Sequence, residues 1–250
     1  MITLIEALNF RCLRYIRRPL TPFHALVGPN ASGKTTFLDV VAFMGQLVAN
    51  GPEAAVRARS ENFQDLVWKR QGAWFELAID AAIPDDLRCQ LANPAFDVVR
   101  YEVRVGADPD SQELSLLAEK VLLKTAESGQ PQQRLLFPVT VEPPGSILTS
   151  QRAGTRTVVN KVPGGNDNFY SEVDKKGGKG WMPSIRLGPG KSALGNLPAD
   201  ETRFPVATWL KKLLAEGVQQ FVLNSLLIRK ASPPGQGRRF RPDGSNLPWV

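Results

Sequence analysis

Hydrophobic and polar residues alternate near the start of the chain, and the pattern there predicts strands followed by a helix. Residues 2–10, ITLIEALNF, alternate as a β-strand does, and 11–18 form a candidate hairpin partner. The apolar run FHALVG at 23–28 ends in glycine, which is typical of a buried strand before a turn. Apolar residues then recur at helical spacing over 34–49, and an Asn-Gly pair is expected to end this helix.

The middle and the end of the chain predict further strands and a second helix. Strand-like segments at 74–83, 98–106 and 113–124 are separated by turn-forming residues, which favours antiparallel pairing. Residues 205–216 predict a helix with proline in its first turn, and 220–228 predict a short strand. These segments together predict a mixed α/β fold with an antiparallel β subdomain.

The stretch 151–195 lacks this regularity, because it is rich in glycine, lysine and asparagine. We expect a long irregular excursion there, since loops of this length are commonly functional or mobile. The predicted organisation is an N-terminal lobe at 1–150, the irregular excursion at 151–198, and a helix plus linker at 199–250.

Composition places the chain among ordinary globular proteins. Hydrophobic residues make up 42% of its 250 residues and charged residues 22%. No apolar run approaches the roughly 20 residues of a membrane span, and no secretion signal is recognisable, so we expect a cytoplasmic protein without a membrane partner. The two cysteines, Cys12 and Cys89, and the single histidine, His24, fit no zinc or disulfide spacing.

Positive charge is concentrated in three stretches of a chain whose net charge is +7. Residues 11–18 hold four arginines and no acidic residue, 151–191 hold eight basic residues against three acidic ones, and 229–241 hold five basic residues and no acidic one. This asymmetry suits a polyanionic partner, meaning a nucleic acid or a nucleotide, and it is equally typical of solvated loops. The charge pattern leaves both interpretations open.

Residues 28–35, GPNASGKT, carry the clearest chemical signal. They fit the phosphate-loop pattern G-x-x-x-x-G-K-[ST], known as Walker A, and they stand between an apolar run and an amphipathic helix. In such a loop, backbone N–H groups and a helix N-terminus form a concave anion site. Lys34 would reach the β- and γ-phosphates, the Thr35 hydroxyl would ligate Mg²⁺, and Thr36 would lie at the α-phosphate end.

Two other stretches resemble nucleotide motifs without completing them. LGPGKSAL at 187–194 has Ile185 where the first glycine should stand, so it predicts a loop. NKVP at 160–163 has proline in place of the aspartate with which GTPases read guanine. The candidate phosphate site is therefore the loop at 28–35.

Segments at both ends of the chain carry a resemblance to a known family. ITLIEALNFRCLRYI at 2–16 ends its strand in NF before a basic hairpin, and HALVGPNASGKTTFLDVVAFM follows at 24–44. FPVATWLKKLL at 204–214 and PDGSNLPWV at 242–250 add a later, linking region. The chain resembles the SMC/RecF-like branch of the ABC-type ATPases, which includes the AAA-type ATPases of DNA-repair and anti-phage systems, among them the overcoming-lysogenization-defect kind.

The resemblance implies ATP and Mg²⁺ as ligands. Phe10, Arg11 and Arg14 in the basic hairpin become candidate nucleotide contacts. Gln64 is the candidate for a glutamine that ligates Mg²⁺ and senses the γ-phosphate, with Gln71 as the second choice. The loop residues expected to bind ATP are Gly28, Asn30, Ala31, Ser32, Gly33, Lys34, Thr35 and Thr36, and Thr35 is also the expected metal ligand.

Two parts that this family uses for hydrolysis are not found in the sequence. No LSGGQ-like serine motif is present, and the nearest Walker B mimic is FELAID at 75–80. This mimic has Glu76 inside the apolar run and no acidic residue after Asp80, so we interpret it as an ordinary edge strand. The resemblance then implies an N-terminal ATPase portion with an incomplete core, which hydrolyses ATP only with a C-terminal half and is inactive alone.

The implied role is ATP-driven dimerisation of two ATPase heads in DNA repair or anti-phage defence. Candidate partners are a second copy or a paired ATPase half, a nuclease or effector subunit, and DNA. Two alternatives stay open. One is a small-molecule phosphotransferase with a basic lid at 151–191. The other is a nucleic-acid-binding module whose basic segments 152–191 and 229–241 meet backbone phosphates and whose nucleotide site only regulates it.

Overall fold

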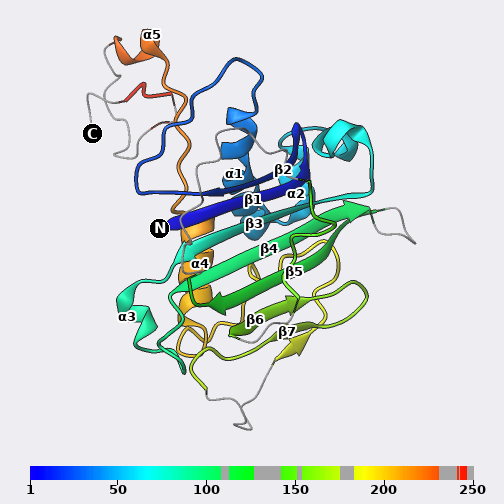
Figure 1. The fold of residues 1–250 in the computed structure, drawn as a ribbon, viewed down its shortest axis with the longest axis vertical. Coiled ribbons are helices and arrows are strands. Elements are labelled where there is room, and N and C mark those ends of the chain that lie inside the picture. Colours follow the sequence, from blue (N-terminus) through cyan, green and yellow to red (C-terminus); the bar gives the residue numbers. More distant parts are fainter. Residues whose placement is uncertain are drawn as a thin grey trace.

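The computed structural model describes residues 1–107, 113–126, 142–150, 154–174, 183–230, 241 and 243–246. Within them the chain forms one antiparallel sheet in the order β2-β1-β3-β4-β5-β6-β7-β8 (Figure 1). The strands are β1 (Ile2–Phe10), β2 (Leu13–Pro19), β3 (Trp74–Ala82), β4 (Val98–Ala107), β5 (Leu114–Lys124), β6 (Thr155–Lys161), β7 (Asp167–Phe169) and β8 (Ser184–Ile185). The predicted mixed α/β class with an antiparallel sheet is confirmed.

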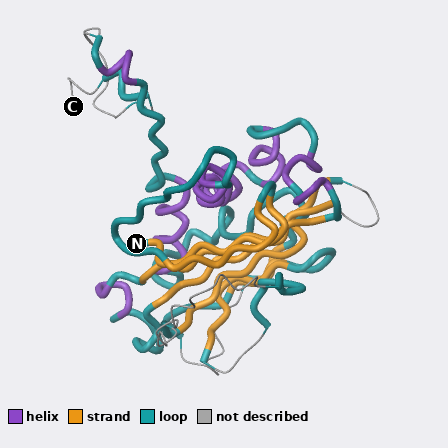
Figure 2. Tube along the Cα trace, turned by 45° about the horizontal axis from the view of Figure 1, so that its top comes forward, coloured by secondary structure: helices purple, strands orange, loops and turns teal. Residues whose placement is uncertain are grey.

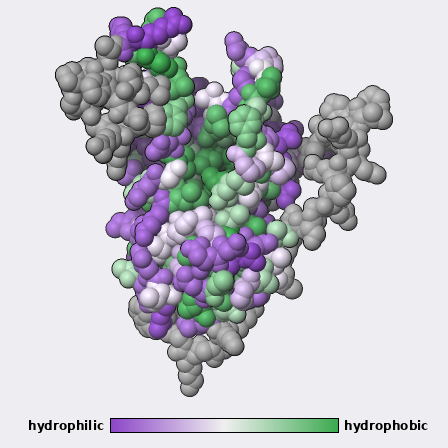
Figure 3. All heavy atoms as spheres, turned by 90° about the vertical axis from the view of Figure 1, so that its left-hand side faces the viewer, coloured by the Kyte–Doolittle hydropathy of each residue, from purple (hydrophilic) through white to green (hydrophobic). Residues whose placement is uncertain are grey.

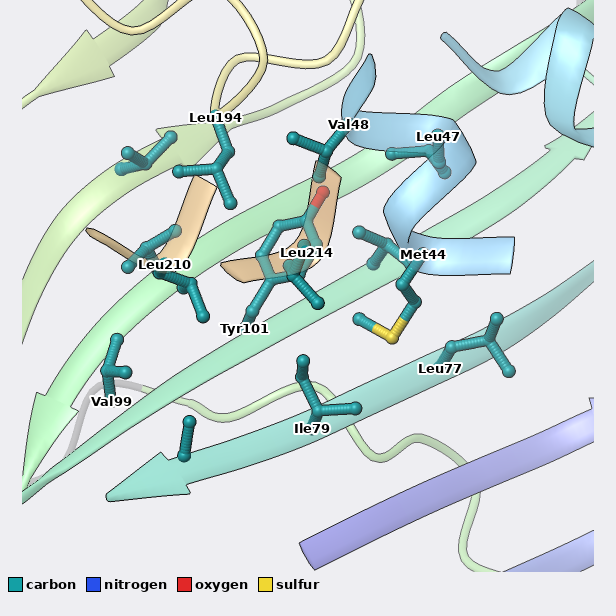
Figure 4. Packing of buried hydrophobic residues seen from close by; sticks show 14 of the residues in the cluster. Met44, Leu47, Val48, Leu77, Ile79, Val99, Tyr101, Leu194, Leu210 and Leu214 are labelled. Carbon is teal, nitrogen blue, oxygen red and sulfur yellow. The ribbon is translucent and has the colours of Figure 1, made fainter. Parts of the chain in front are cut away.

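The described helices are α1 (Lys34–Asn50), α2 (Pro52–Arg57), α3 (Asp85–Arg88), α4 (Pro205–Ala215) and α5 (Ser225–Ile228), with 3₁₀ turns η1 (Phe63–Leu66) and η2 (Trp68–Arg70). Helices α1, α2 and α4 lie on the same side of the sheet (Figure 2). Their apolar residues form one core with alternate residues of the strands, since successive strand residues point to opposite faces. Figure 4 shows part of this core, in which Met44, Leu47, Val48, Leu77, Ile79, Val99, Tyr101, Leu194, Leu210 and Leu214 pack together.

Three phenylalanine rings anchor α1 to the sheet. The ring of Phe43 in α1 lies 5.7 Å from that of Phe10 and 5.4 Å from that of Phe75, between ring centroids. Phe10 reaches this core because the preceding residue, Asn9, has a left-handed φ of 59°, which breaks the alternation of β1. Aromatic clusters of this kind bury a large apolar area, so the second half of α1 is firmly held.

Backbone-to-backbone contacts hold α1 against its neighbours. A Cβ atom on Gly45 of α1 would collide with the carbonyl oxygen of Leu214, at the end of α4. A Cβ atom on Gly195 would likewise collide with the carbonyl oxygen of Val48. Only glycine permits these approaches, and they fix α1 relative to α4 and the loop before it.

The opposite face of the sheet carries paired charges. The guanidinium of Arg100 on β4 donates to Glu6 at 2.8 Å, to Asp80 at 3.1 Å and to Glu102 at 2.8 Å, and all four side chains are buried. Residues 142–150 cover this face, because Glu102 accepts a hydrogen bond from the Thr149 N–H at 2.7 Å. The charges are matched and hydrogen-bonded, as burial requires.

Two buried carboxylates tie loops to the core. Glu119 accepts hydrogen bonds from the Tyr101 hydroxyl at 2.9 Å and the Leu194 N–H at 3.0 Å, and burial raises its pKa. Glu172 accepts from the N–H groups of Val206 at 2.6 Å and Ala207 at 2.8 Å, at the start of α4. Burial raises the pKa of Glu172 to about 7, although these backbone N–H groups act against the rise.

Four expectations need correction. Residues 23–28 form no strand, because no neighbouring strand pairs with them among the described residues. Residues 220–228 hold the short helix α5 instead of a strand, since Asn224 caps a helical turn. The described part of 151–198 is not irregular throughout, because β6, β7 and β8 extend the sheet; β6 is rich in the β-branched residues Thr and Val, which favour a strand. Strand β3 is interior, as β1 and β4 flank it.

Some expectations fall on residues that the structure does not describe. They include the glycine- and lysine-rich run at 175–182, most of the basic stretch at 229–241 and the end of the motif at 242–250. In the described part of the chain, no helix has the length and apolar character needed to cross a bilayer.

Candidate functional site

The phosphate loop leads directly into helix α1. Gly33 caps the helix with a left-handed φ of 89°, and Ala31 has a φ of 63° within the turn before it. A side chain at Gly28 would meet Ser32 Oγ at 2.9 Å. Glycine is therefore required at 33 for its conformation and favoured at 28 for space. The predicted helix start at Lys34 is confirmed, and no side chain caps it; the first N–H groups of a helix have no partner within the helix.

Lys34 folds back over the loop that precedes it. Its Nζ donates to the carbonyl oxygens of Gly28 at 2.8 Å and Pro29 at 2.6 Å, and it lies 3.3 Å from Ser32 Oγ. These are exposed contacts, which contribute little net stability because water can replace them. The ammonium group is thus at the mouth of the loop, where an incoming anion could replace the carbonyl oxygens as its partner.

The hairpin between β1 and β2 packs against the start of α1. Cys12 Sγ lies 3.2 Å from Thr36 Oγ1, and a Cβ on Gly33 would lie 3.3 Å from Cys12 Sγ and from Leu13 Cδ2. The structure therefore places the hairpin against Gly33 and Thr36, two of the residues expected to bind the nucleotide. Both Cys12 and Cys89 are free and exposed.

Arg11, a tentative nucleotide contact, has a protein partner in this structure. Its Nη1 lies 3.1 Å from Asp39 Oδ2 on α1, and its φ of 50° is left-handed. Asp39 also receives the Arg59 guanidinium at 2.6 Å, and Arg59 stacks on the Phe43 ring at 4.9 Å. The structure thus places Arg11 next to the loop, within a charge network that orients it.

Asp39 and Arg59 are site-supporting residues that the sequence does not reveal. They stand twenty positions apart without a motif, and their pairing depends on the turn of the chain after α2. Arg59 also donates to Gln46 Oε1 at 2.9 Å and to the Ala55 carbonyl at 2.7 Å. A largely buried guanidinium with several hydrogen bonds, as in Arg59, connects Asp39 and Gln46 of α1 to Ala55 of α2.

Gln64 lies in η1, close to the hairpin. The N–H of Arg11 donates to the Leu66 carbonyl at 2.8 Å, two residues after Gln64. Gln64 Oε1 is buried and has no hydrogen-bond partner among the described residues. Buried polar atoms are nearly always paired, so this oxygen is a free acceptor of the kind a metal or a donor would satisfy. Gln71, the second choice, is exposed at the end of η2.

The candidate Mg²⁺ ligands, Thr35 and Gln64, both offer oxygen atoms. Thr35 is exposed at the loop, and Gln64 offers its unpaired oxygen. In the described ranges no group of three His, Cys, Asp or Glu side chains is placed to hold a metal. This donor set suits Mg²⁺, which is commonly held by few protein oxygens together with phosphate oxygens and water.

The acidic residues of the Walker B mimic are directed away from the loop. Glu76 is buried and accepts from Arg104 Nε at 2.7 Å and from the Ile147 N–H at 2.6 Å. Asp80 pairs with Arg100 at 3.1 Å and Lys124 at 2.8 Å. Both carboxylates belong to the charged face of the sheet, whereas α1 packs on the other face. They are structural ion-pair partners.

Comparisons with known proteins match parts of this chain. A model of the AAA domain described as a putative AbiEii toxin of a type IV toxin–antitoxin system matches residues 23–84. An OLD nuclease of Thermus scotoductus is 49% identical over 41 residues, which are 16% of this chain and 8% of that protein. The chain thus matches only a small fraction of this relative's length.

Two solved structures were also found. One, from work on ATP-driven dimerization and DNA-stimulated activation of SMC ATPases, has a TM-score of 0.34 and 23% identity, and covers 50% of this chain and 69% of the other. The other, an Smc head bound to the C-terminal winged-helix domain of ScpA, has a TM-score of 0.33 and 23% identity, and covers 49% of this chain and 35% of the other. The predicted resemblance to AAA-type ATPases that include the overcoming-lysogenization-defect kind is confirmed, and the AAA-domain model places it at residues 23–84.

Proposed function

We propose that this chain is the nucleotide-binding, N-terminal part of an SMC/RecF-like ATPase with a P-loop core. The observation that carries the proposal is the complete Walker A sequence at 28–35, set in a loop with a left-handed glycine at the start of a buried helix. The match of residues 23–84 to an AAA-domain model supports ATP as the nucleotide.

In this proposal, different side chains around the loop bind ATP and Mg²⁺. Lys34 would leave the carbonyl oxygens of Gly28 and Pro29 for the β- and γ-phosphates, and the N–H groups at the start of α1 would donate hydrogen bonds to phosphate oxygens. Thr35 and Gln64 supply oxygen ligands to the metal. When bound, Mg²⁺ would neutralise phosphate charge and favour attack at the γ-phosphate.

The catalytic acid and the partner serine would come from a C-terminal half. Glu76 and Asp80 are held in ion pairs on the far face of the sheet, so neither of them can act as a general base at the loop. Apolar residues next to the loop are exposed, with Phe23 at 85% and Val27 at 94%. Figure 3 shows hydrophobic surface gathered in the hollow between two projections of the molecule. An exposed apolar surface of this kind is typical of a docking site, and the proposed C-terminal half would pack there.

The proposed biological role is a switch in which ATP joins two such heads and hydrolysis releases them. DNA repair and anti-phage defence are the settings we propose for it. Because the matched relative is named as a nuclease, a nuclease module or subunit that responds to this switch is part of the proposal. DNA is a further proposed partner, supported by the net charge of +7.

Turnover measurements test this proposal. The 250-residue chain alone should hydrolyse ATP no faster than a buffer blank, whereas addition of the polypeptide that supplies a Walker B strand should give turnover. Lys34→Ala should remove that turnover. Lys191→Ala, in the incomplete motif at 187–194, is the matched control and should leave it unchanged. Robust hydrolysis by the chain alone that Lys34→Ala abolishes would contradict the missing-half interpretation.

A further inference from the structure

A pocket of about 200 Å³ opens beside the later strands of the sheet, and the proposed function does not use it. It lies between the start of β5, the turn from β6 to β7, and the segment that follows β8 (Figure 1). Pockets for drug-sized ligands have volumes of roughly 300–1,000 Å³. The volume of this pocket is smaller, so it suits a smaller molecule.

The pocket is separate from the phosphate loop. A Cβ atom on Gly51, which caps the C-terminal end of α1, would lie 2.8 Å from the carbonyl oxygen of Gly190. Gly190 directly follows Pro189, one of the residues that line the pocket. The phosphate loop stands before the opposite end of α1, and a helix of 17 residues is about 25 Å long. The pocket is therefore no part of the candidate nucleotide site.

Two cationic side chains line the pocket, and only one of them is neutralised. Lys161 is buried, and its Nζ donates to Asp167 Oδ1 at 2.8 Å and to the Gly188 carbonyl at 2.8 Å. Asp167 Oδ2 accepts from the Leu187 N–H at 2.9 Å, so both oxygens of this carboxylate are occupied. Arg186 lines the same pocket and has no hydrogen bond or ion pair with any residue in the described part of the chain. The pocket therefore carries one uncompensated positive charge.

The free donors of these two side chains suit one anionic group. An ammonium group has three protons, and Lys161 Nζ uses two of them for protein oxygens, so one remains. The guanidinium of Arg186 is a planar fork that pairs with two oxygens of an anion. Lys161 is held by its buried contacts, whereas Arg186 is exposed and can adjust to a ligand.

The rest of the lining is largely apolar or glycine. Leu116 and Leu117 of β5 and Pro189 supply hydrocarbon surface. Gly164 and Gly188 lie in the two loops of the pocket and have left-handed φ values of 68° and 84°. Glycine adopts this conformation at no steric cost, so both loops can hold these turns. A lining of this kind suits a ligand that has a short hydrocarbon part besides its negative group.

We propose that this pocket binds a small organic carboxylate. Its carboxylate group pairs with Arg186 and the remaining proton of Lys161, and its hydrocarbon part contacts Leu116 and Pro189. The single uncompensated positive charge matches a monoanion, whereas a phosphate ester carries about −1.5 to −2 charges at pH 7. The inference does not depend on the proposed function, because the pocket needs no nucleotide in the loop.

NMR titration of the full chain, labelled with nitrogen-15, tests the inference with butyrate, n-butanol and inorganic phosphate as probes. Butyrate should shift the amide signals of Gly164 and Gly188 and the side-chain Nε signal of Arg186, and the shifts should saturate. Butanol has a similar hydrocarbon part without charge and should cause no saturable shift, and phosphate should bind more weakly than butyrate. Arg186→Gln should weaken butyrate binding roughly tenfold or more, since a charge-assisted pair is lost. Arg186→Lys should weaken it less, because it keeps the charge and loses only the fork.

The matched control is Arg18→Gln, which removes the same charge from an exposed position on β2, at the other edge of the sheet. It should leave butyrate binding unchanged. The inference is overturned if folded wild type shows no saturable shift with butyrate, or if wild type and Arg186→Gln bind it equally well. Tighter binding of phosphate than of butyrate would overturn the assignment of a carboxylate ligand. Equal weakening by Arg18→Gln and Arg186→Gln would also overturn the inference, because butyrate would then respond to overall charge and not to the pocket.

Discussion

The two ends of helix α1 lie in opposite surroundings. At its C-terminal end, Phe43 and Leu47 are completely buried and Gly45 touches the backbone of α4. At its N-terminal end, the preceding segment exposes Phe23 and Val27, and the helix itself exposes Leu38. One end belongs to the buried core, whereas the segment before the other end leaves apolar side chains exposed; Figure 3 shows hydrophobic surface in a hollow of the molecule.

This difference separates the part of the chain that stabilises the fold from the part that binds ligand. In the antiparallel sheet and the second half of α1, apolar side chains are buried in the core, and buried charges on the sheet are paired. The loop side leaves its N–H groups and its lysine near solvent, which is what an anion site requires. Changes at the two ends should therefore give separable effects on stability and on binding.

The largest expected effect comes from a pair of phenylalanines at the two ends. Phe43→Ala removes a ring that packs between Phe10 and Phe75, so the free energy of unfolding should fall by about 3–5 kcal/mol. Phe23→Ala removes an exposed ring and should change it by less than about 0.5 kcal/mol. Chemical denaturation of both variants measures the difference. Equal losses would show that the loop side is as well packed as the core.

A pH effect of up to about 3 kcal/mol is expected from Glu172, because burial raises its pKa from 4.5 to about 7. The folded protein binds this proton more tightly than the unfolded chain does. The contribution of Glu172 to stability is therefore fully present below about pH 4.5 and is lost as the pH rises through about 7.

Glu172→Gln cannot titrate, so its stability should fall less than that of wild type between pH 5 and pH 8 in denaturation experiments. Arg156 and Asp174 face the same region and remain unchanged in this variant. Parallel pH profiles for the two proteins would contradict the assignment of the effect to Glu172.

The smallest expected change in the free energy of unfolding comes from Gly45, where α1 contacts α4. Gly45→Ala places a methyl group against the carbonyl oxygen of Leu214, and the resulting strain should destabilise the fold by about 1–3 kcal/mol. Gly145→Ala is the matched control, since nothing lies within 4 Å of its added Cβ. Thermal unfolding measures both. Equal melting temperatures for the two variants would contradict the close contact between α1 and α4.

Much of the fold can be predicted from the sequence, where local pattern and final environment agree. The alternation in β1, β3, β4 and β5 and the helical spacing of α1 correspond to residues that one sheet face or one core buries. The segment 23–28 has the same apolar character but no strand beside it in the described structure, so pattern alone predicted a strand that does not form.

The candidate site could be predicted only in part. The Walker A residues are contiguous, so their spacing carries their chemistry. The pairing of Arg11 and Arg59 on Asp39, and the stacking of Arg14 on Trp68, join residues from separate elements. Those contacts depend on how the hairpin folds over α1, which no local pattern records. Glu76 is held in an ion pair on the charged face of the sheet, and its strand, predicted at the edge, lies in the interior.

Equilibrium binding of ATP in the presence of Mg²⁺ to the chain and to Lys34→Ala tests the central claim most directly. The account predicts saturable binding by the wild-type chain, loss of most of that binding in Lys34→Ala, and unchanged stability of the variant, because the contacts of Lys34 are exposed. Equal binding by the two proteins, or no binding by a correctly folded wild-type chain, would contradict the claim that residues 28–36 hold a nucleotide.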